Sequence, residues 1–166
     1  ISNPPPAIGT GDFTFVAWIR SVSHAANSGA GIIGGASNAL TVRLGANGTV
    51  FLGKVGVSDS AESIATIPEG KWTSIAVIHS ATTTKVAIDG VVGNLTGQTV
   101  YQPASGYTDL SDAIGARTSG GLNKFTGNIC RPAIYNRALS DAEILALHES
   151  GSPSPADYKA ATQTLG

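Results

Sequence analysis

Cysteine is almost absent from this chain of 166 residues, since Cys130 is the only one. A single cysteine excludes a disulfide framework within the chain and a zinc site built on cysteines. We expect Cys130 to be a buried small hydrophobe. Methionine is missing altogether and the chain starts at Ile1. We therefore expect a processed or trimmed product, or the ordered part of something longer.

Charge is also scarce, because charged residues make up 13% of the chain, about half the share usual for a soluble protein. The net charge is −1 and no run of lysines or arginines occurs, so nucleic acid and anionic membranes are not expected as partners. No stretch reaches the roughly 18 apolar residues that a membrane span needs. A weakly charged surface favours association, so other protein chains of a larger assembly are expected partners.

The length fits one domain of ordinary size with a substantial core. The opening segment contains three consecutive prolines, which favour an extended chain without ladder hydrogen bonds. We predict an extended arm over residues 1–11, a folded domain over 12–151, and a tail or linker over 152–166.

Alternating segments predict strands through most of the domain. Between residues 13 and 20 both alternating sets contain large apolar residues, so we expect this strand to be covered on both faces. Asn47-Gly48 and Asp89-Gly90 follow β-prone runs and predict tight hairpins, because these residues tolerate positive φ. The segment 58–70 is polar and is expected to connect strands. Two successive hairpins predict an antiparallel sheet.

One helix is predicted near the end, over Asp141–Glu149. Ser140 and Glu143 form a capping-box sequence, Leu139 and Ile144 can form a hydrophobic staple across it, and Gly151 can end the helix in a left-handed cap. Pro132 interrupts the preceding strand and predicts an edge position or a bulge. The fold class is therefore all-β: a two-sheet antiparallel sandwich, or jelly roll, with one short C-terminal helix.

Three segments resemble laminin G-like domains of the concanavalin A-like type. They are the early strand 12–19, the hairpin 72–90, and a closing strand and helix that contain Ile134-Tyr135-Asn136-Arg137-Ala138-Leu139-Ser140. The resemblance covers residues 12 to 151 and implies the concanavalin A-like jelly roll. The residues after 151 also resemble the segment found C-terminal to such domains in bacteriophage virion proteins.

Two features depart from the family pattern. Its domains usually have one more strand before residue 12, so the short N-terminus is expected to leave an edge that the arm, the tail or another chain must cover. Many relatives also have acidic residues where this chain has Cys130-Arg131, which puts any site served by those acids in doubt.

Sugar recognition needs an aromatic platform with polar partners, because a pyranose has an apolar face and a ring of hydroxyls. The long loops toward the end of the domain can supply both. The candidate ligand-binding residues are Tyr101, Tyr107, Asp109, Arg117, Asn123 and Lys124. Trp18 and Trp72 lie inside strand patterns, so we expect core packing for them.

The resemblance also implies that some members of the family bind calcium. Asp109, Asp112 and Asn123 offer oxygen ligands on a loop. Their spacing matches no EF-hand, and solvated turn residues would look the same. No other cofactor is expected.

Catalysis has little support in the sequence. Related glycoside hydrolases carry a Glu-x-Asp-x-x-Glu strand that this chain lacks, and Asp141 and Glu143 suit the helix N-terminus instead. His24, His79 and His148 are available for a serine-histidine site, but no nucleophile-elbow sequence accompanies them. We expect surface or structural roles for these histidines and predict no enzyme.

The favoured interpretation is a non-catalytic binding or adhesion module that recognises carbohydrate or a cell surface within a phage tail, fibre or decoration protein. Its place would be the virion, the cell surface or the extracellular space. One alternative is a purely structural virion subunit. Another is an accessory carbohydrate-binding domain of a secreted polysaccharide-degrading enzyme.

Overall fold

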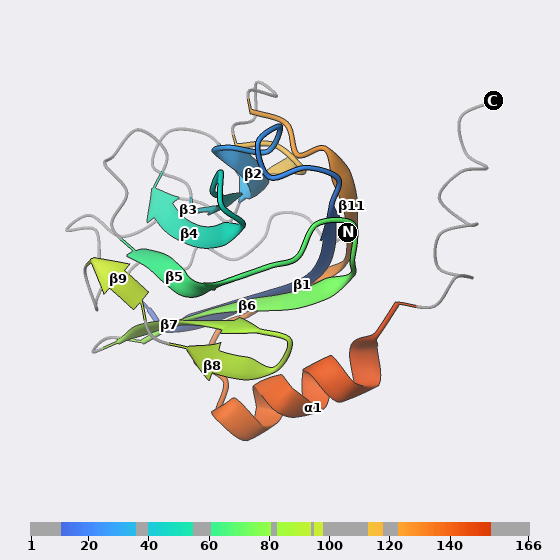
Figure 1. Cartoon of the computed structure of the whole chain (residues 1–166). Helices are drawn as coiled ribbons and strands as arrows, with labels where there is room; N and C mark the ends of the chain where they lie inside the picture. Colours follow the sequence, from blue (N-terminus) through green and yellow to red (C-terminus); the bar gives the residue numbers. More distant parts are fainter. Residues whose placement is uncertain are drawn as a thin grey trace.

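The strands form two antiparallel sheets that face each other (Figure 1), in the strand orders β11-β1-β6-β7-β8 and β10-β2-β3-β4-β5-β9. The computed structural model describes residues 11–35, 40–54, 61–80, 83–93, 95–97, 113–117 and 123–153. The five-stranded sheet contains β1 (Phe13–Ser21), β6 (Thr73–His79), β7 (Thr84–Ile88), β8 (Val91–Gly93) and β11 (Gly127–Tyr135). The six-stranded sheet contains β2 (Ala30–Gly34), β3 (Leu40–Leu44), β4 (Thr49–Lys54), β5 (Ala61–Thr66), β9 (Leu95–Gly97) and β10 (Ala113–Ile114).

A helix, α1 (Asp141–Gly151), completes the described fold and lies against the side of the five-stranded sheet that faces away from the other sheet (Figure 1). This architecture confirms the predicted two-sheet antiparallel sandwich with one C-terminal helix. No helix in the described ranges is long and apolar enough to cross a membrane.

The main core lies between the two sheets and follows the alternation of the strands. Phe13, Phe15 and Ile19 of β1 are fully buried in it. From the other sheet, β3 adds Leu40, Val42 and Leu44 on its inner face. The side chains between these on β3 therefore face away from the core.

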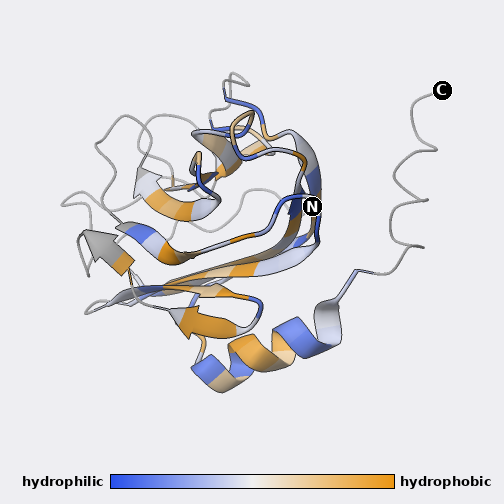
Figure 2. Cartoon of the chain, viewed as in Figure 1, coloured by the Kyte–Doolittle hydropathy of each residue, from blue (hydrophilic) through white to orange (hydrophobic). Residues whose placement is uncertain are grey.

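A second apolar cluster joins α1 to the outer face of the five-stranded sheet. Ala76, Ile78 and Ala87 pack there with Leu139 and Ile144. Figure 2 shows apolar residues on β8 and in the middle of α1. Because the sheet is covered on both sides, the prediction that the first strand is buried on both faces is confirmed.

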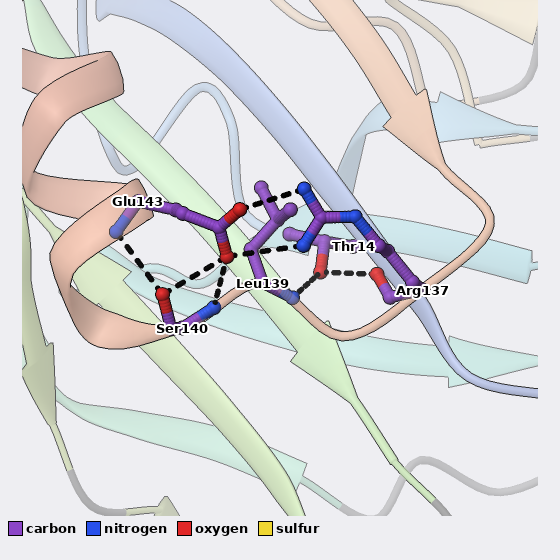
Figure 3. A network of polar contacts seen from close by, with 5 residues as sticks. All are labelled: Thr14, Arg137, Leu139, Ser140 and Glu143. Atoms are coloured by element: carbon purple, nitrogen blue, oxygen red, sulfur yellow. Dashed lines mark hydrogen bonds and ion pairs between the residues drawn. The ribbon is translucent and has the colours of Figure 1, made fainter.

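The N-terminus of α1 is capped as predicted. Ser140 Oγ accepts a hydrogen bond from Glu143 N, and Ser140 N donates to Glu143 Oε2 (Figure 3). Thr14 Oγ1 donates to Arg137 O and accepts from Leu139 N, both at 2.9 Å. This fully buried hydroxyl fastens the segment before the helix to β1.

The C-terminus of α1 differs from the prediction. Gly151 is the last residue of the helix and does not have positive φ, and Ser152, which follows it, has a φ of −53°. A Cβ on Gly151 would lie 2.8 Å from Trp18 Nε1. The glycine therefore permits close packing on Trp18, and the predicted left-handed cap at this position is wrong.

Both predicted hairpins form. Asp89 and Gly90 have φ of 49° and 78° and link β7 to β8 in a two-residue turn. Between β3 and β4 only Gly48 has positive φ, so the prediction of a tight turn with positive φ at Asn47 is wrong. A longer loop forms there because Gly45 N donates to Thr49 O at 2.8 Å.

Several other predictions were incomplete. The polar segment 58–70 contains β5, whose few β-branched residues gave a weak strand signal, and β9 was not predicted. Cys130 is half-buried rather than buried. Pro132 lies on the edge strand β11 beside a register shift, as predicted.

The first strand is not an edge, because β1 pairs with β6 on one side and with β11 on the other. The edge expected from the short N-terminus is therefore not an edge of β1. Apart from Gly11, Ser152 and Pro153, the predicted arm (1–11) and tail (152–166) lie outside the described residues. These domain boundaries stay predictions.

Candidate functional site

The backbone of residues 116 and 117 crosses over the outer face of strand β2 in the six-stranded sheet. Gly31 and Gly34 of β2 lie directly against the segment that comes after β10. A Cβ on Gly31 would lie 2.3 Å from Arg117 N, and one on Gly34 would lie 2.0 Å from Arg117 O. The absence of side chains at these two glycines lets residues 116 and 117 lie on the outer face of β2.

Backbone contacts connect the start of the next segment to the same place. Lys124 forms isolated β-bridges with Gly31 and with Ala116. Gly31 N donates to Asn123 O at 3.0 Å, and Asn123 itself has a left-handed φ of 50°. Residues 117, 123 and 124 are therefore brought together although they come from two segments.

Arg43 completes this group from strand β3. It pairs with Gly31, so its side chain lies on the same outer face. A Cβ on Gly29 would lie 4.0 Å from both Arg43 Nη1 and Asn123 Nδ2. We call Arg43, Arg117, Asn123 and Lys124 the cationic cluster.

The cationic cluster continues into a row across the sheet. Arg43 pairs with Phe51 of β4, and Phe51 pairs with Glu62 of β5. The guanidinium carbon of Arg43 lies 5.5 Å from the centre of the Phe51 ring, a cation–π distance. Arg43 is 7% exposed and Phe51 is half-buried, so both form the floor of this surface.

The structure describes only three residues of the predicted ligand site, whose role in binding stays a prediction. It brings Arg117 (half-buried), Asn123 and Lys124 (both exposed) together. Tyr101, Tyr107, Asp109 and Asp112 lie outside the described residues. The aromatic platform and the calcium ligands therefore stay predictions. Within the described ranges, no group of His, Cys, Asp or Glu side chains is arranged to hold a metal ion.

Sequence reasoning missed Arg43 and Phe51. A signal was present, because Arg43 is a charged residue between the apolar residues Val42 and Leu44. A cation at that position must lie on the opposite face from its neighbours. The clustering of Arg43 with Arg117, Asn123 and Lys124 depends on the crossing of residues 116 and 117 over β2, which no sequence periodicity indicates.

The carboxylate of Glu143 is fully engaged in the network at the start of α1 (Figure 3). It accepts hydrogen bonds from Arg137 Nη1 and Nη2 at 3.0 and 2.7 Å, and others from Ser140. The Arg137 hydrogen bonds, followed by those of Ser140, lower the pKa of Glu143 to about 2. Glu143 is therefore ionised near neutral pH and is not a suitable general acid. This agrees with the prediction that it caps the helix.

Two of the three histidines form close side-chain contacts inside the fold. His79 is buried, stacks on Phe13 and hydrogen-bonds Thr84 Oγ1 at 2.9 Å. Burial lowers its pKa, against the opposing charge of Asp12. His148 stacks on Trp18 with ring centroids 5.3 Å apart, so Trp18 packs against the helix and offers no open sugar platform.

His148 Nδ1 also lies 2.8 Å from Ser74 Oγ, the spacing of a serine-histidine pair. A catalytic triad needs a carboxylate on the other ring nitrogen. The nearby Asp89 carboxylate instead accepts from Ser74 N at 3.0 Å. Among the described residues, no carboxylate hydrogen-bonds the other ring nitrogen of His148.

The fold defines a class, the antiparallel sandwiches built like concanavalin A. The profile of the family described as the Concanavalin A-like lectin/glucanases superfamily (Laminin_G_3) matches residues 1–145, and the chain belongs to this family. No curated protein matches the chain.

Three solved structures illustrate its likeness to known folds. A carbohydrate-binding module (CBM40) of a Ruminococcus gnavus IT-sialidase, bound to α2,3-sialyllactose, is 17% identical at a TM-score of 0.64, covering 85% of this chain and 84% of that one. A candidate carbohydrate-binding protein from Bacteroides ovatus is 14% identical at a TM-score of 0.60, with 82% of this chain and 40% of that protein covered. Trypanosoma rangeli sialidase is 19% identical at a TM-score of 0.60, with 84% of this chain and 23% of that protein covered. The chain thus spans less than half of the last two proteins.

Proposed function

We propose that this chain is a non-catalytic carbohydrate-binding module, and that its cationic cluster binds a glycan carrying a carboxylate. The observation that carries the proposal is that backbone contacts with Gly31 bring Arg117, Asn123 and Lys124 together, next to the strand position of Arg43. The whole chain has ten lysines and arginines, and three of them belong to this cluster. Such a concentration in a charge-poor protein favours an anionic ligand.

The side-chain chemistry suits an acidic sugar. Arginine presents a planar fork that binds a carboxylate through two parallel hydrogen bonds, and the Asn123 amide can both donate to and accept from hydroxyls. Phe51 contributes an aromatic ring beneath Arg43. The one described carboxylate in this row, Glu62, lies beyond Phe51 and away from Arg117.

The comparisons support carbohydrate as the ligand class. The sialidase module that resembles this chain along most of both lengths was solved with α2,3-sialyllactose, an acidic glycan. A non-catalytic role is consistent with the engagement of Glu143 by Arg137.

The setting of the module is a further part of the proposal. The likeness of the tail to virion proteins favours adhesion within a phage tail, fibre or decoration protein, with other chains of that assembly as partners and the virion or extracellular space as its place. One observation favours the accessory domain of a sugar-processing enzyme instead: this chain covers 23% of the Trypanosoma sialidase. The neighbouring sequence in the same reading frame distinguishes these settings.

The binding proposal is tested by calorimetric titration of the full chain with α2,3-sialyllactose and with lactose. We expect binding of the acidic glycan only, and an affinity at least about tenfold lower in the double variant Arg117→Gln, Lys124→Gln. The matched control is Arg20→Gln, Lys71→Gln, which removes two exposed charges from elsewhere. Thermal unfolding verifies that both variants fold.

Two outcomes of this titration would contradict different parts of the proposal. If neither sugar binds, and a glycan array shows no other ligand, the module is not carbohydrate-binding and the structural-subunit alternative gains support. If a glycan binds but the double variant binds it equally well, carbohydrate recognition stands and the cationic cluster is the wrong site.

A further inference from the structure

A cavity of about 240 Å³ lies between α1 and the outer face of the five-stranded sheet, on the far side of that sheet from the cationic cluster. Its lining residues come from β1, β6, β7 and β11 of the sheet and from α1. The cavity plays no part in the glycan site, and it does not depend on the proposed function.

Small side chains in the sheet create the space. Val16, Ala76 and Ala87 line the cavity from three neighbouring strands and are cross-strand partners of one another. Ile144 and Leu147 of α1 line it from the opposite side. Ala76 and Ala87 pack in the same apolar cluster as Ile144, but their short side chains fill only part of the space beneath the helix, and a cavity remains beside them.

Polar groups gather at the end of the cavity near the C-terminus of α1. Trp18, Ser74, Arg131, Tyr135 and His148 all line it. His148 is fixed by its stack on Trp18 and its contact with Ser74 Oγ, and Arg131 Nη1 donates to Gly151 O at 2.9 Å. Among the described residues, no aspartate or glutamate belongs to the lining. The nearby Asp89 carboxylate is engaged by Ser74 N at 3.0 Å.

Two backbone features hold this end in place. Arg131 has a φ of 50°, an uncommon conformation for a residue with a side chain, and it lies where the pairing of β1 with β11 shifts register. Gly151 packs so closely on the Trp18 indole that any side chain would collide with it. These two features place Arg131 and the Trp18 indole side by side in the lining of the apolar cavity.

We propose that this cavity is a second binding site, for a small apolar molecule that carries a carboxylate, such as a single-ring aromatic acid. An apolar cavity of about 150 Å³ admits benzene, so this larger one has room for a ring and a carboxylate. The ring occupies the chamber between the alanines and the helix. The carboxylate lies at the cationic end, where the Arg131 guanidinium and the Trp18 indole N–H are hydrogen-bond donors.

The test uses the full chain and para-fluorobenzoate as the probe, observed by fluorine NMR, with para-fluorobenzamide as its neutral counterpart. We expect the acid to bind, with the amide at least about tenfold weaker. Ala87→Leu fills the chamber and should abolish binding, while Arg131→Gln should weaken binding of the acid about tenfold and leave the amide unchanged. Arg117→Gln, Lys124→Gln is the matched control, because it removes cations outside the cavity.

Different outcomes of this binding test support or contradict the proposed second site. Loss of binding in Ala87→Leu with unfolding temperature preserved, together with an intact response of the control, supports the site. The proposal is overturned if the acid does not bind at millimolar concentration, if Ala87→Leu binds as the unmodified chain does, or if acid and amide bind equally. Should Ala87→Leu fail to fold, Arg131→Gln with the acid and amide pair still decides the question.

Discussion

Gly31 and Arg117 are in such close backbone contact that the position of Arg117 depends on the absence of a side chain at residue 31. A Cβ there would lie 2.3 Å from Arg117 N and 2.4 Å from the carbonyl of Ala116. Because these atoms belong to the backbone, no rotamer change can relieve the collision. Gly31, together with Gly34, therefore controls where Arg117 lies over β2.

Gly31→Ala should accordingly lower the free energy of unfolding by about 1 to 3 kcal/mol, as overpacking does, and should weaken glycan binding. Gly93→Ala is the control, since its Cβ would lie 3.7 Å from its nearest neighbour. Urea unfolding monitored by tryptophan fluorescence measures both variants. Equal stability of the two would contradict the close approach over β2.

Thr14→Val should destabilise the protein by about 1 to 3 kcal/mol, although valine has nearly the same shape. The hydroxyl that it removes accepts from Leu139 N and donates to Arg137 O, and both backbone groups would lose this partner. Thr14→Ser retains the hydroxyl and should recover most of the loss. If valine and serine behave alike in thermal unfolding, the hydroxyl does not fasten the helix segment to β1.

Stability should decrease as the pH falls below about 6.5. Burial lowers the pKa of His79 from its ordinary value of 6.5, so the unfolded chain binds this proton more readily than the folded one. The contribution is fully present above pH 6.5 and declines as the pH falls through the lower, folded-state pKa. His79→Asn should flatten the dependence of Tm on pH between about 7 and 5, and an unchanged slope would show that another group is responsible.

Glycan affinity should depend on salt if the cationic cluster binds a carboxylate. Raising the ionic strength from about 0.05 to 0.5 M shortens the Debye length well below 10 Å. We expect affinity for α2,3-sialyllactose to fall, and the loss to be smaller in Arg117→Gln, Lys124→Gln. Affinity that is independent of salt would indicate recognition through neutral hydrogen bonds and stacking.

The sequence predicted those parts of the structure that depend on local pattern. The alternation in β1, the Asp89-Gly90 turn and the capping box at Ser140 are each readable from a few neighbouring residues, and each is confirmed. The strand β5 was missed because Ala61–Thr66 has little apolar alternation and is held by pairing with β4 and β9. That pairing joins residues distant in the chain.

The candidate site was predictable only in part for the same reason. Arg117, Asn123 and Lys124 were predicted to share a site from their loop setting alone. Arg43 joins them because β2 and β3 pair and because two glycines admit the crossing segment. Gly151 was misinterpreted as a cap, since its close approach to Trp18 is a tertiary contact with no signature in the helix sequence.

The most direct test of the account is a titration of isotope-labelled protein with α2,3-sialyllactose, monitored through the backbone amide resonances. If the cationic cluster binds the glycan, we expect the largest shifts on the amides of Gly31, Arg117, Asn123 and Lys124, and unchanged resonances for the amides of α1. Saturable shifts confined to other surfaces, or no shifts at millimolar glycan, would contradict it.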